Sequence, residues 1–146
     1  MLEKFLNKST INILENVKDW QDSINIVSKP LIKNKIIEKR YVDAIFKTHE
    51  DLGPYYVLAP GIAMPHARPE QGSNGMGLSL LIVKNGVNFN SLENDPVYII
   101  VMLAAKDSDS HIELISSLSD LLDNEQDINV LKNGSLEEII KVIEKY

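Results

Sequence analysis

The sequence contains no cysteine among its 146 residues. That absence excludes a disulfide framework, a thiolate metal site and a thiol nucleophile. Positive charge is scarce as well, because 15 lysine and arginine residues stand against 21 acidic residues, which gives a formal net charge of −6. A nucleic-acid-binding protein needs a basic face, so this charge balance argues against nucleic acid as a partner.

Long apolar runs are also missing. No stretch approaches the ~18 consecutive apolar residues of a membrane-spanning helix. The N-terminus, M-L-E-K-F-L-N-K, is too short and too interrupted by charge to be a signal peptide. We therefore expect a soluble, cytoplasmic protein without direct membrane insertion, organised as one domain over residues 1–146.

The most informative stretch is residues 59–70, A-P-G-I-A-M-P-H-A-R-P-E. Its three prolines fix their own backbone angles and restrict the residue before each of them, while Gly61 permits angles that are closed to other residues. This composition disfavours a continuous helix or a central strand, and it predicts a stiff loop that holds His66 at a defined place. An ordinary proline-rich connection with an incidental histidine would have the same composition.

Strands are predicted around this loop at residues 9–17, 55–58, 78–83 and 97–104. The last is an unbroken apolar run, V-Y-I-I-V-M-L-A, which is typical of a strand buried on both faces. Asn85-Gly86 predicts a tight turn, with residues 87–89 returning as the second strand of a hairpin. The pattern as a whole predicts an α/β fold in which helices cover both sides of a central sheet.

Five helices are predicted. The first begins after an Asp19 cap and ends or kinks near Ser28, because Pro30 interrupts the pattern. The second spans residues 38–50, and the helix dipole alone can explain His49 in its last turn. The third helix follows a Ser110–Glu113 capping box, and the fourth covers residues 124–131. The fifth begins after a capping box at residues 135–138.

His111 falls in the first turn of the helix that follows the strand at 97–104. Helix N-termini attract anions, and open α/β sheets usually bind ligands outside the C-terminal ends of their strands. The dipole also disfavours a charged ring here, so we expect a neutral His111 that donates one N–H to an anion. The alternative is a histidine that only marks a helix start.

These residues narrow the possible chemistry. Without cysteine or an HExxH pattern no metal site is indicated, and without G-x-S-x-G no serine hydrolase is indicated. The glycine-containing stretch at 71–77 lacks the pattern of a nucleotide loop, so we expect a flexible connection and no cofactor. What remains is a histidine nucleophile that takes a phosphoryl group, with His111 and the guanidinium of Arg68 stabilising the oxygens. Arg68 is equally compatible with an ordinary surface arginine.

The motif G-I-A-M-P-H-A-R-P-E, followed 45 residues after its histidine by S-H-I-E-L-I, resembles the enzyme IIA components of the bacterial sugar phosphotransferase system. The resemblance is to the mannitol/fructose superfamily, and G-P-Y-Y-V-L-A-P-G-I-A-M-P-H-A-R-P-E is most similar to the ascorbate-type branch. It covers essentially the whole chain. It implies a three-layer α/β/α sandwich with a mixed central sheet flanked by helices.

The resemblance also implies a phosphotransferase that works through a phosphohistidine. His66 matches the histidine that the carrier HPr phosphorylates, and His111 matches the second active-site histidine. The group would pass to a cysteine of a IIB component, which phosphorylates a sugar, here ascorbate or a related one, imported by the membrane component IIC. A regulatory IIA-type protein, which acts by phosphorylation-dependent protein binding, is the alternative, and an anion-binding module without turnover is a third reading.

One departure concerns the assisting cation. Mannitol-type members have a glycine after the loop histidine and an arginine near the end of the preceding helix. This chain instead has Ala67-Arg68 and, at the helix end, Lys47-Thr48-His49-Glu50. The assisting cation could therefore be Arg68, Lys47 or His49, and we favour Arg68.

Overall fold

The computed structural model describes every residue of the chain except 108 and 110. Its centre is one mixed sheet of five strands in the order β1-β4-β5-β3-β2. The pairs β1–β4 and β3–β5 are parallel, whereas β4–β5 and β2–β3 are antiparallel. The strands are β1 (Ile11–Leu14), β2 (Val57–Ala59), β3 (Ile62–Ala63), β4 (Gly77–Val87) and β5 (Val97–Ala104).

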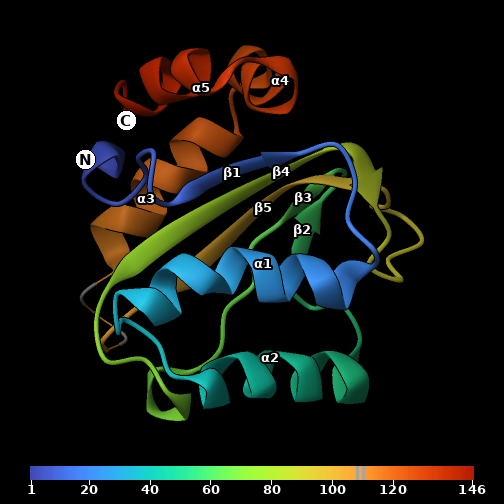
Figure 1. The fold of residues 1–146 in the computed structure, drawn as a ribbon, viewed down its shortest axis with the longest axis vertical. Helices are drawn as coiled ribbons and strands as arrows, with labels where there is room; N and C mark the ends of the chain where they lie inside the picture. The colour runs from blue at the N-terminus through green and yellow to red at the C-terminus, as the bar shows by residue number, and fades with distance from the viewer. Residues whose placement is uncertain (108, 110) are drawn as a thin grey trace.

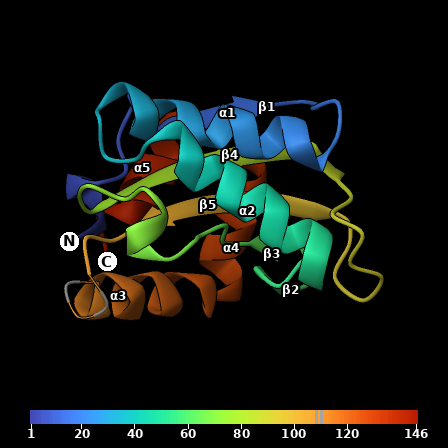
Figure 2. The same ribbon diagram turned by 90° about the horizontal axis from the view of Figure 1, so that it is seen from below.

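Helices cover both faces of this sheet (Figure 1). Helices α1 (Trp20–Lys33) and α2 (Lys39–Leu52) lie on one side, and α3 (Ile112–Leu122), α4 (Glu125–Asn133) and α5 (Leu136–Ile143) lie on the other. Two short 3₁₀ turns, η1 (Leu2–Lys4) and η2 (Pro69–Gln71), complete the described elements. Figure 2 shows the two termini close together, where the Met1 ammonium donates to the Tyr146 carbonyl oxygen at 2.6 Å. The expected three-layer α/β/α sandwich is confirmed.

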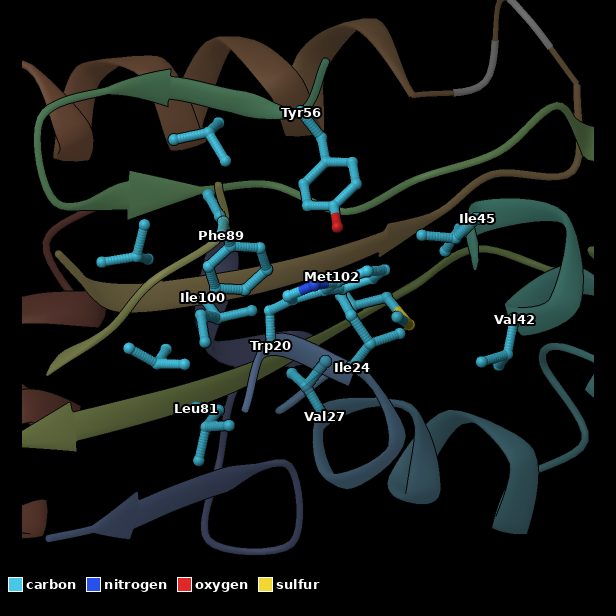
Figure 3. Packing of buried hydrophobic residues seen from close by; sticks show 14 of the residues in the cluster. Trp20, Ile24, Val27, Val42, Ile45, Tyr56, Leu81, Phe89, Ile100 and Met102 are labelled. Carbon is cyan, nitrogen blue, oxygen red and sulfur yellow. The ribbon is translucent and has the colours of Figure 1, made fainter. Parts of the chain in front are cut away.

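The apolar run of β5 is continuous because both of its faces are buried. Side chains alternate along a strand, so Ile100 and Met102 join the core beneath α1 and α2, whereas Ile99 and Val101 join the core beneath α3, α4 and α5. Figure 3 shows the first of these cores, in which Trp20 of α1 lies among aliphatic side chains of the sheet and the aromatic rings of Tyr56 and Phe89, which flank its strands.

Of the two expectations for the first helix near Ser28, an end or a kink, the end is wrong. Helix α1 continues to Lys33 and holds Pro30 inside its last turns. Leu31 is buried in the core, and the carbonyl oxygen of Pro30 accepts from Asn34 N–H at 3.1 Å. Burial of this turn and its backbone bonds therefore keep the helix going past a residue that lacks an amide donor.

The expected hairpin at Asn85-Gly86 is wrong too. Both residues lie within β4, and the chain reverses only over residues 88–96 before β5 begins. Gly86 has a φ of +76°, and the register of β4 against β5 shifts between Ile82 and Val87. A positive φ at a glycine suits a bulge as well as a turn, so the dipeptide marks an irregularity inside one long strand.

The proline-rich stretch contains a strand that its composition did not indicate. Strand β3 comprises only Ile62 and Ala63, and it lies inside the sheet between β2 and β5. These two residues are free of proline and keep both amide donors, while Pro60 and Pro65 lie on either side of them. This short pairing fixes the start of the loop that carries His66 beside the C-terminal half of β5.

Candidate active site

A single pocket brings together the three residues singled out from the sequence. His66, Arg68 and His111 line a cavity of about 210 Å³ at the C-terminal end of β5. Its remaining lining residues are Tyr41, Ala67, Pro69, Leu103 and Ala105. The pocket lies outside the carboxyl end of an inner strand, which is where open α/β sheets usually bind ligands.

The loop before His66 is held by backbone hydrogen bonds to β5 and to the segment before β2. The amide of Met64 donates to the Tyr56 carbonyl at 2.9 Å, and the amide of Leu103 donates to the Pro65 carbonyl at 3.1 Å. Pro65 itself is buried. The loop is therefore anchored on both sides immediately before the histidine, as its proline content suggested.

The imidazole of His66 is oriented by its own loop. Its Nδ1 lies 2.7 Å from the Met64 carbonyl oxygen. A carbonyl oxygen only accepts, so Nδ1 carries the hydrogen, and in the neutral ring Nε2 carries the lone pair. Among the described residues, His49 Nε2 is the one buried side-chain nitrogen or oxygen without a hydrogen-bond partner. Nε2 of His66 is therefore not a buried atom that lacks a partner, and the His66 residue as a whole is half-buried.

Two tyrosines also contact this loop, and no sequence motif indicated their role. The hydroxyl of Tyr41 accepts from the Ala67 amide at 3.0 Å and donates to the Leu103 carbonyl at 2.8 Å. The hydroxyl of Tyr55 donates to the His66 carbonyl, and the two rings meet edge to face with centroids 5.6 Å apart. Burial raises the pKa of Tyr41, and it raises the pKa of Tyr55 to about 12, so both hydroxyls keep their hydrogen at neutral pH.

His111 lies one position earlier than expected, at the N-cap of α3. Its Nδ1 is 3.0 Å from the Asp107 carbonyl oxygen, so Nδ1 is again the nitrogen that donates. A neutral His111 then offers a lone pair at Nε2, and it can donate there only after gaining a proton. The expectation that a neutral His111 donates an N–H to an anion is corrected, because the N–H of the neutral ring is used by the Asp107 carbonyl. Ser110 of the expected Ser110–Glu113 capping box lies outside the described residues.

The three possible assisting cations occupy different places. Arg68 is exposed and lines the pocket, with its backbone amide donating to Gln71 Oε1 at 2.8 Å. Lys47 is not among the lining residues, and its ammonium lies 3.8 Å from an Asp51 carboxylate oxygen on the surface of α2. His49 is buried in the core. Of the three, Arg68 alone borders the space beside His66.

His49 is a core residue, and aromatic packing explains its position better than the helix dipole does. Its ring stacks on Trp20 with centroids 3.8 Å apart, and its Nδ1 lies 2.7 Å from the Tyr56 hydroxyl. Only 5% of the residue is exposed. Burial lowers the pKa of His49 and outweighs the opposite effect of the Glu50 carboxylate.

We expect His49 to make the protein sensitive to acid. An unfolded histidine has a pKa of about 6.5, and the folded pKa is lower, so below pH ~6.5 the unfolded state binds a proton that the folded state does not. This contribution to the free energy of unfolding is absent above that pH, and it becomes more destabilising as the pH falls toward the folded pKa. Urea unfolding at about pH 8 and about pH 5.5 should show a larger loss for the wild type than for His49→Phe. Equal losses would contradict this assignment.

The structure also bears on the metal site and the membrane span considered above. Among the described residues, no three histidine, aspartate or glutamate side chains are grouped so that they could hold a metal ion. Over the same residues, no helix has the length and apolar character needed to cross a membrane.

Comparison with known proteins gives consistent matches over nearly the full length. The sequence profile described as "Phosphoenolpyruvate-dependent sugar phosphotransferase system, EIIA 2" matches residues 4–146. The mannitol-specific cryptic phosphotransferase enzyme IIA component of Escherichia coli (strain K12) is 39% identical over 136 residues, which cover 93% of this chain and 92% of that protein. The ascorbate-specific EIIA component of Shigella boydii serotype 4 (strain Sb227) is 38% identical over 141 residues, with 95% and 91% covered.

Solved structures agree with these sequence matches. The solution structure of the mannitol-specific cryptic enzyme IIA from Escherichia coli has a TM-score of 0.91 at 36% identity and covers 99% of both chains. The complex of enzyme IIA and phosphorylated enzyme IIB of the mannitol system, also from Escherichia coli, matches with a TM-score of 0.82 at 26% identity, covering 97% of this chain and 98% of that one. The resemblance inferred from the two histidine motifs is confirmed. The chain belongs to the EIIA 2 family of the phosphoenolpyruvate-dependent sugar phosphotransferase system, whose members are phosphotransferases.

Proposed function

We propose that this chain is a cytoplasmic phosphocarrier that takes a phosphoryl group from phospho-HPr on His66 and gives it to a cysteine of a IIB component. The observation that supports this most directly is the hydrogen bond from His66 Nδ1 to the Met64 carbonyl. It leaves Nε2 as the nucleophilic nitrogen of a half-buried ring, in a pocket that Arg68 and His111 also line.

His66 can accept the phosphoryl group from phospho-HPr without gaining or losing a proton. The Nε2 lone pair attacks the phosphorus of phospho-HPr, an N–P bond forms at Nε2, and the N–P bond of the donor breaks with its electron pair returning to the donor nitrogen. The hydrogen stays on Nδ1 and remains hydrogen-bonded to the Met64 carbonyl oxygen. The phosphorylated ring of His66 therefore carries a positive charge next to the negatively charged phosphoryl oxygens.

The same hydrogen bond favours the second transfer. When a thiolate attacks the phosphorus, the bond from Nε2 breaks and its electron pair returns to the ring. Because Nδ1 has kept its hydrogen, His66 leaves as a neutral imidazole and needs no proton from elsewhere. The protein then mainly positions the group and spreads the charge of its oxygens.

Arg68 and His111 are proposed to provide that charge stabilisation. The guanidinium of Arg68 offers several N–H donors in a fork that matches phosphoryl oxygens, and Arg68 borders the pocket from the exposed side. His111 borders it from the start of α3, and its Nε2 is the ring nitrogen not used by the Asp107 carbonyl. Neither residue would carry the phosphoryl group itself.

One relative supports the choice of a IIB partner. The neighbouring structure in which a IIA binds phosphorylated IIB supports a IIB acceptor for this chain, and the membrane component IIC would be reached only through IIB. We propose ascorbate or a related sugar as the transported compound, on the motif that resembles the ascorbate-type branch. A mannitol-specific relative is as similar as an ascorbate-specific one, at 39% and 38% identity, so the IIB component that accepts the group will decide between them.

A transfer assay without divalent metal tests this function. The chain should take the phosphoryl group from purified phospho-HPr and pass it to the cysteine of an ascorbate-type IIB component in the presence of a strong chelator, because no metal takes part in either step. Starting from purified phospho-HPr matters, since enzyme I requires Mg²⁺ upstream. Loss of transfer under chelation would contradict the metal-free mechanism, and phosphorylation without transfer to ascorbate-type or mannitol-type IIB would favour the regulatory alternative.

A further inference from the structure

The peptide bond between His66 and Ala67 is held at both ends by tyrosine hydroxyls. Its carbonyl oxygen accepts from Tyr55, which precedes β2, and its amide donates to Tyr41 of α2 at 3.0 Å. The two tyrosines thus reach the same peptide unit from different parts of the chain. Neither hydroxyl is assigned a part in the mechanism described above.

We propose that Tyr41 and Tyr55 are positioning residues that clamp this peptide unit and thereby keep His66 in its Nδ1–H form with Nε2 free. The proposal deepens the proposed function and rests on it, because it concerns the residue that would carry the phosphoryl group. Neither tyrosine is a catalytic residue on this account, since each acts through the backbone of His66.

The two tyrosines fix the plane of the peptide unit between His66 and Ala67. A peptide unit is rigid, so fixing its oxygen and its amide fixes the orientation of the whole plane. That plane begins at the Cα of His66, and its orientation sets how the side chain leaves the backbone. The ring can then keep Nδ1 at 2.7 Å from the Met64 carbonyl, which defines the tautomer. If the plane could rotate, the His66 ring could also adopt orientations in which Nδ1 does not reach the Met64 carbonyl.

The Tyr41 hydroxyl can both donate and accept, which suits a clamp that joins three parts of the chain. A tyrosine hydroxyl has one hydrogen, and two carbonyl oxygens lie near the Tyr41 hydroxyl, that of Leu103 at 2.8 Å and that of Ala67 at 3.3 Å. The hydrogen is donated to the nearer oxygen, that of Leu103. A lone pair then remains for the Ala67 amide. Through this one oxygen, α2 is connected to the end of β5 and to the residue after His66. Only 1% of Tyr41 is exposed, so no water competes freely for either bond.

Phenylalanine variants isolate the hydroxyls, because they keep the ring packing. The set is Tyr41→Phe, Tyr55→Phe, the double variant and Tyr146→Phe. The last is a matched control, since it also removes a bonded tyrosine hydroxyl, here one that donates to Asp127 of α4 and does not line the pocket. Thermal unfolding of each variant shows that it is folded. Should Tyr41→Phe fail to fold, Tyr55→Phe still tests the clamp, because Tyr55 is 37% exposed and contributes less to the core.

The first readout is the tautomer of His66 in the unphosphorylated protein. Two-bond ¹⁵N–¹H correlation spectra, taken where the ring is neutral and assigned by comparison with His66→Ala, distinguish a hydrogen on Nδ1 from one on Nε2. We expect wild type and Tyr146→Phe to hold the hydrogen on Nδ1, and each clamp variant to show a mixture of the two forms. A purely structural loss would lower the melting temperature without moving this signal.

The second readout is single-turnover phosphorylation by phospho-HPr. Each clamp variant should be slower than wild type by about 2- to 10-fold, which corresponds to one net hydrogen bond. The double variant should be slowed by less than the product of the two single effects, because either loss already frees the same peptide unit.

A His66 tautomer that stays as in wild type in both single variants would overturn the proposal. This outcome is separate from failure of the proposed function, because the tautomer is measured without any phosphoryl donor. If His66 were never labelled, the phosphocarrier function would fail while the spectra would still decide whether the tyrosines hold the ring.

Discussion

Replacing His66 by alanine is expected to abolish covalent phosphorylation of this protein. The change removes the imidazole proposed to accept the group, a ring that lines the pocket and whose Nδ1 is engaged by the Met64 carbonyl, which leaves Nε2 as the nucleophile. After incubation with phosphoenolpyruvate, enzyme I and HPr, the wild type should gain the mass of one phosphoryl group, and His66→Ala should gain none. The modification should be labile in acid and stable in base, as a phosphoramidate bond is.

The control for this experiment is a histidine substitution that leaves the carrier in place. His49→Phe removes an imidazole from the aromatic core and should still be labelled, provided that circular dichroism shows an intact fold. Labelling of His66→Ala at the wild-type level would show that another residue carries the group, and the assignment of His66 would then be wrong.

Replacing His111 by alanine is expected to slow transfer to IIB without preventing phosphorylation of His66. The lost interaction is one hydrogen bond to a charged phosphoryl oxygen, which is worth ~1.5–3 kcal/mol, or about 10- to 150-fold in rate. Since Nδ1 of His111 donates to the Asp107 carbonyl, Nε2 must bear a proton to make this bond. His111→Gln, whose amide donates without gaining a proton, should recover part of the rate.

The measurement for His111 is single-turnover transfer from phosphorylated protein to purified IIB. Equal rates for wild type and His111→Ala would reduce this residue to the start of a helix. Complete loss of labelling in a folded His111→Ala protein would instead make it essential to the acceptor step, contrary to the supporting role assigned here.

The layers of the fold could be predicted because they depend on local pattern. The apolar run 97–104 is β5, and the Asp19 cap begins α1 with its side chain accepting from the Asp22 amide at 2.8 Å. The failures occurred where long-range packing overrode local composition. Leu31 is buried beyond Pro30, Gly86 serves a bulge against β5, and Ile62 pairs inside a stretch rich in proline.

The candidate site could be predicted only in part. His66, Arg68 and His111 were selected by residue type and by resemblance, and the sequence could suggest that they meet because strand ends and helix starts gather at one edge of a sheet. Tyr41 and Tyr55 could not be found in this way. Their partners are backbone atoms that the fold brings to them, and Tyr41 is one of the buried residues on the inner face of α2. The sequence likewise could not indicate that the Asp107 carbonyl defines the His111 tautomer.

The most direct test of the central claim is to locate the phosphorus atom. Protein labelled with ¹⁵N in its histidines, phosphorylated by phospho-HPr, should show one phosphoryl group by intact mass and a ³¹P–¹⁵N coupling to a single ring nitrogen. We expect that nitrogen to be Nε2 of His66, because Nδ1 is occupied by its hydrogen bond to the Met64 carbonyl. Coupling to Nδ1, coupling to a nitrogen of His49 or His111, or a mass without any added phosphoryl group would contradict the account.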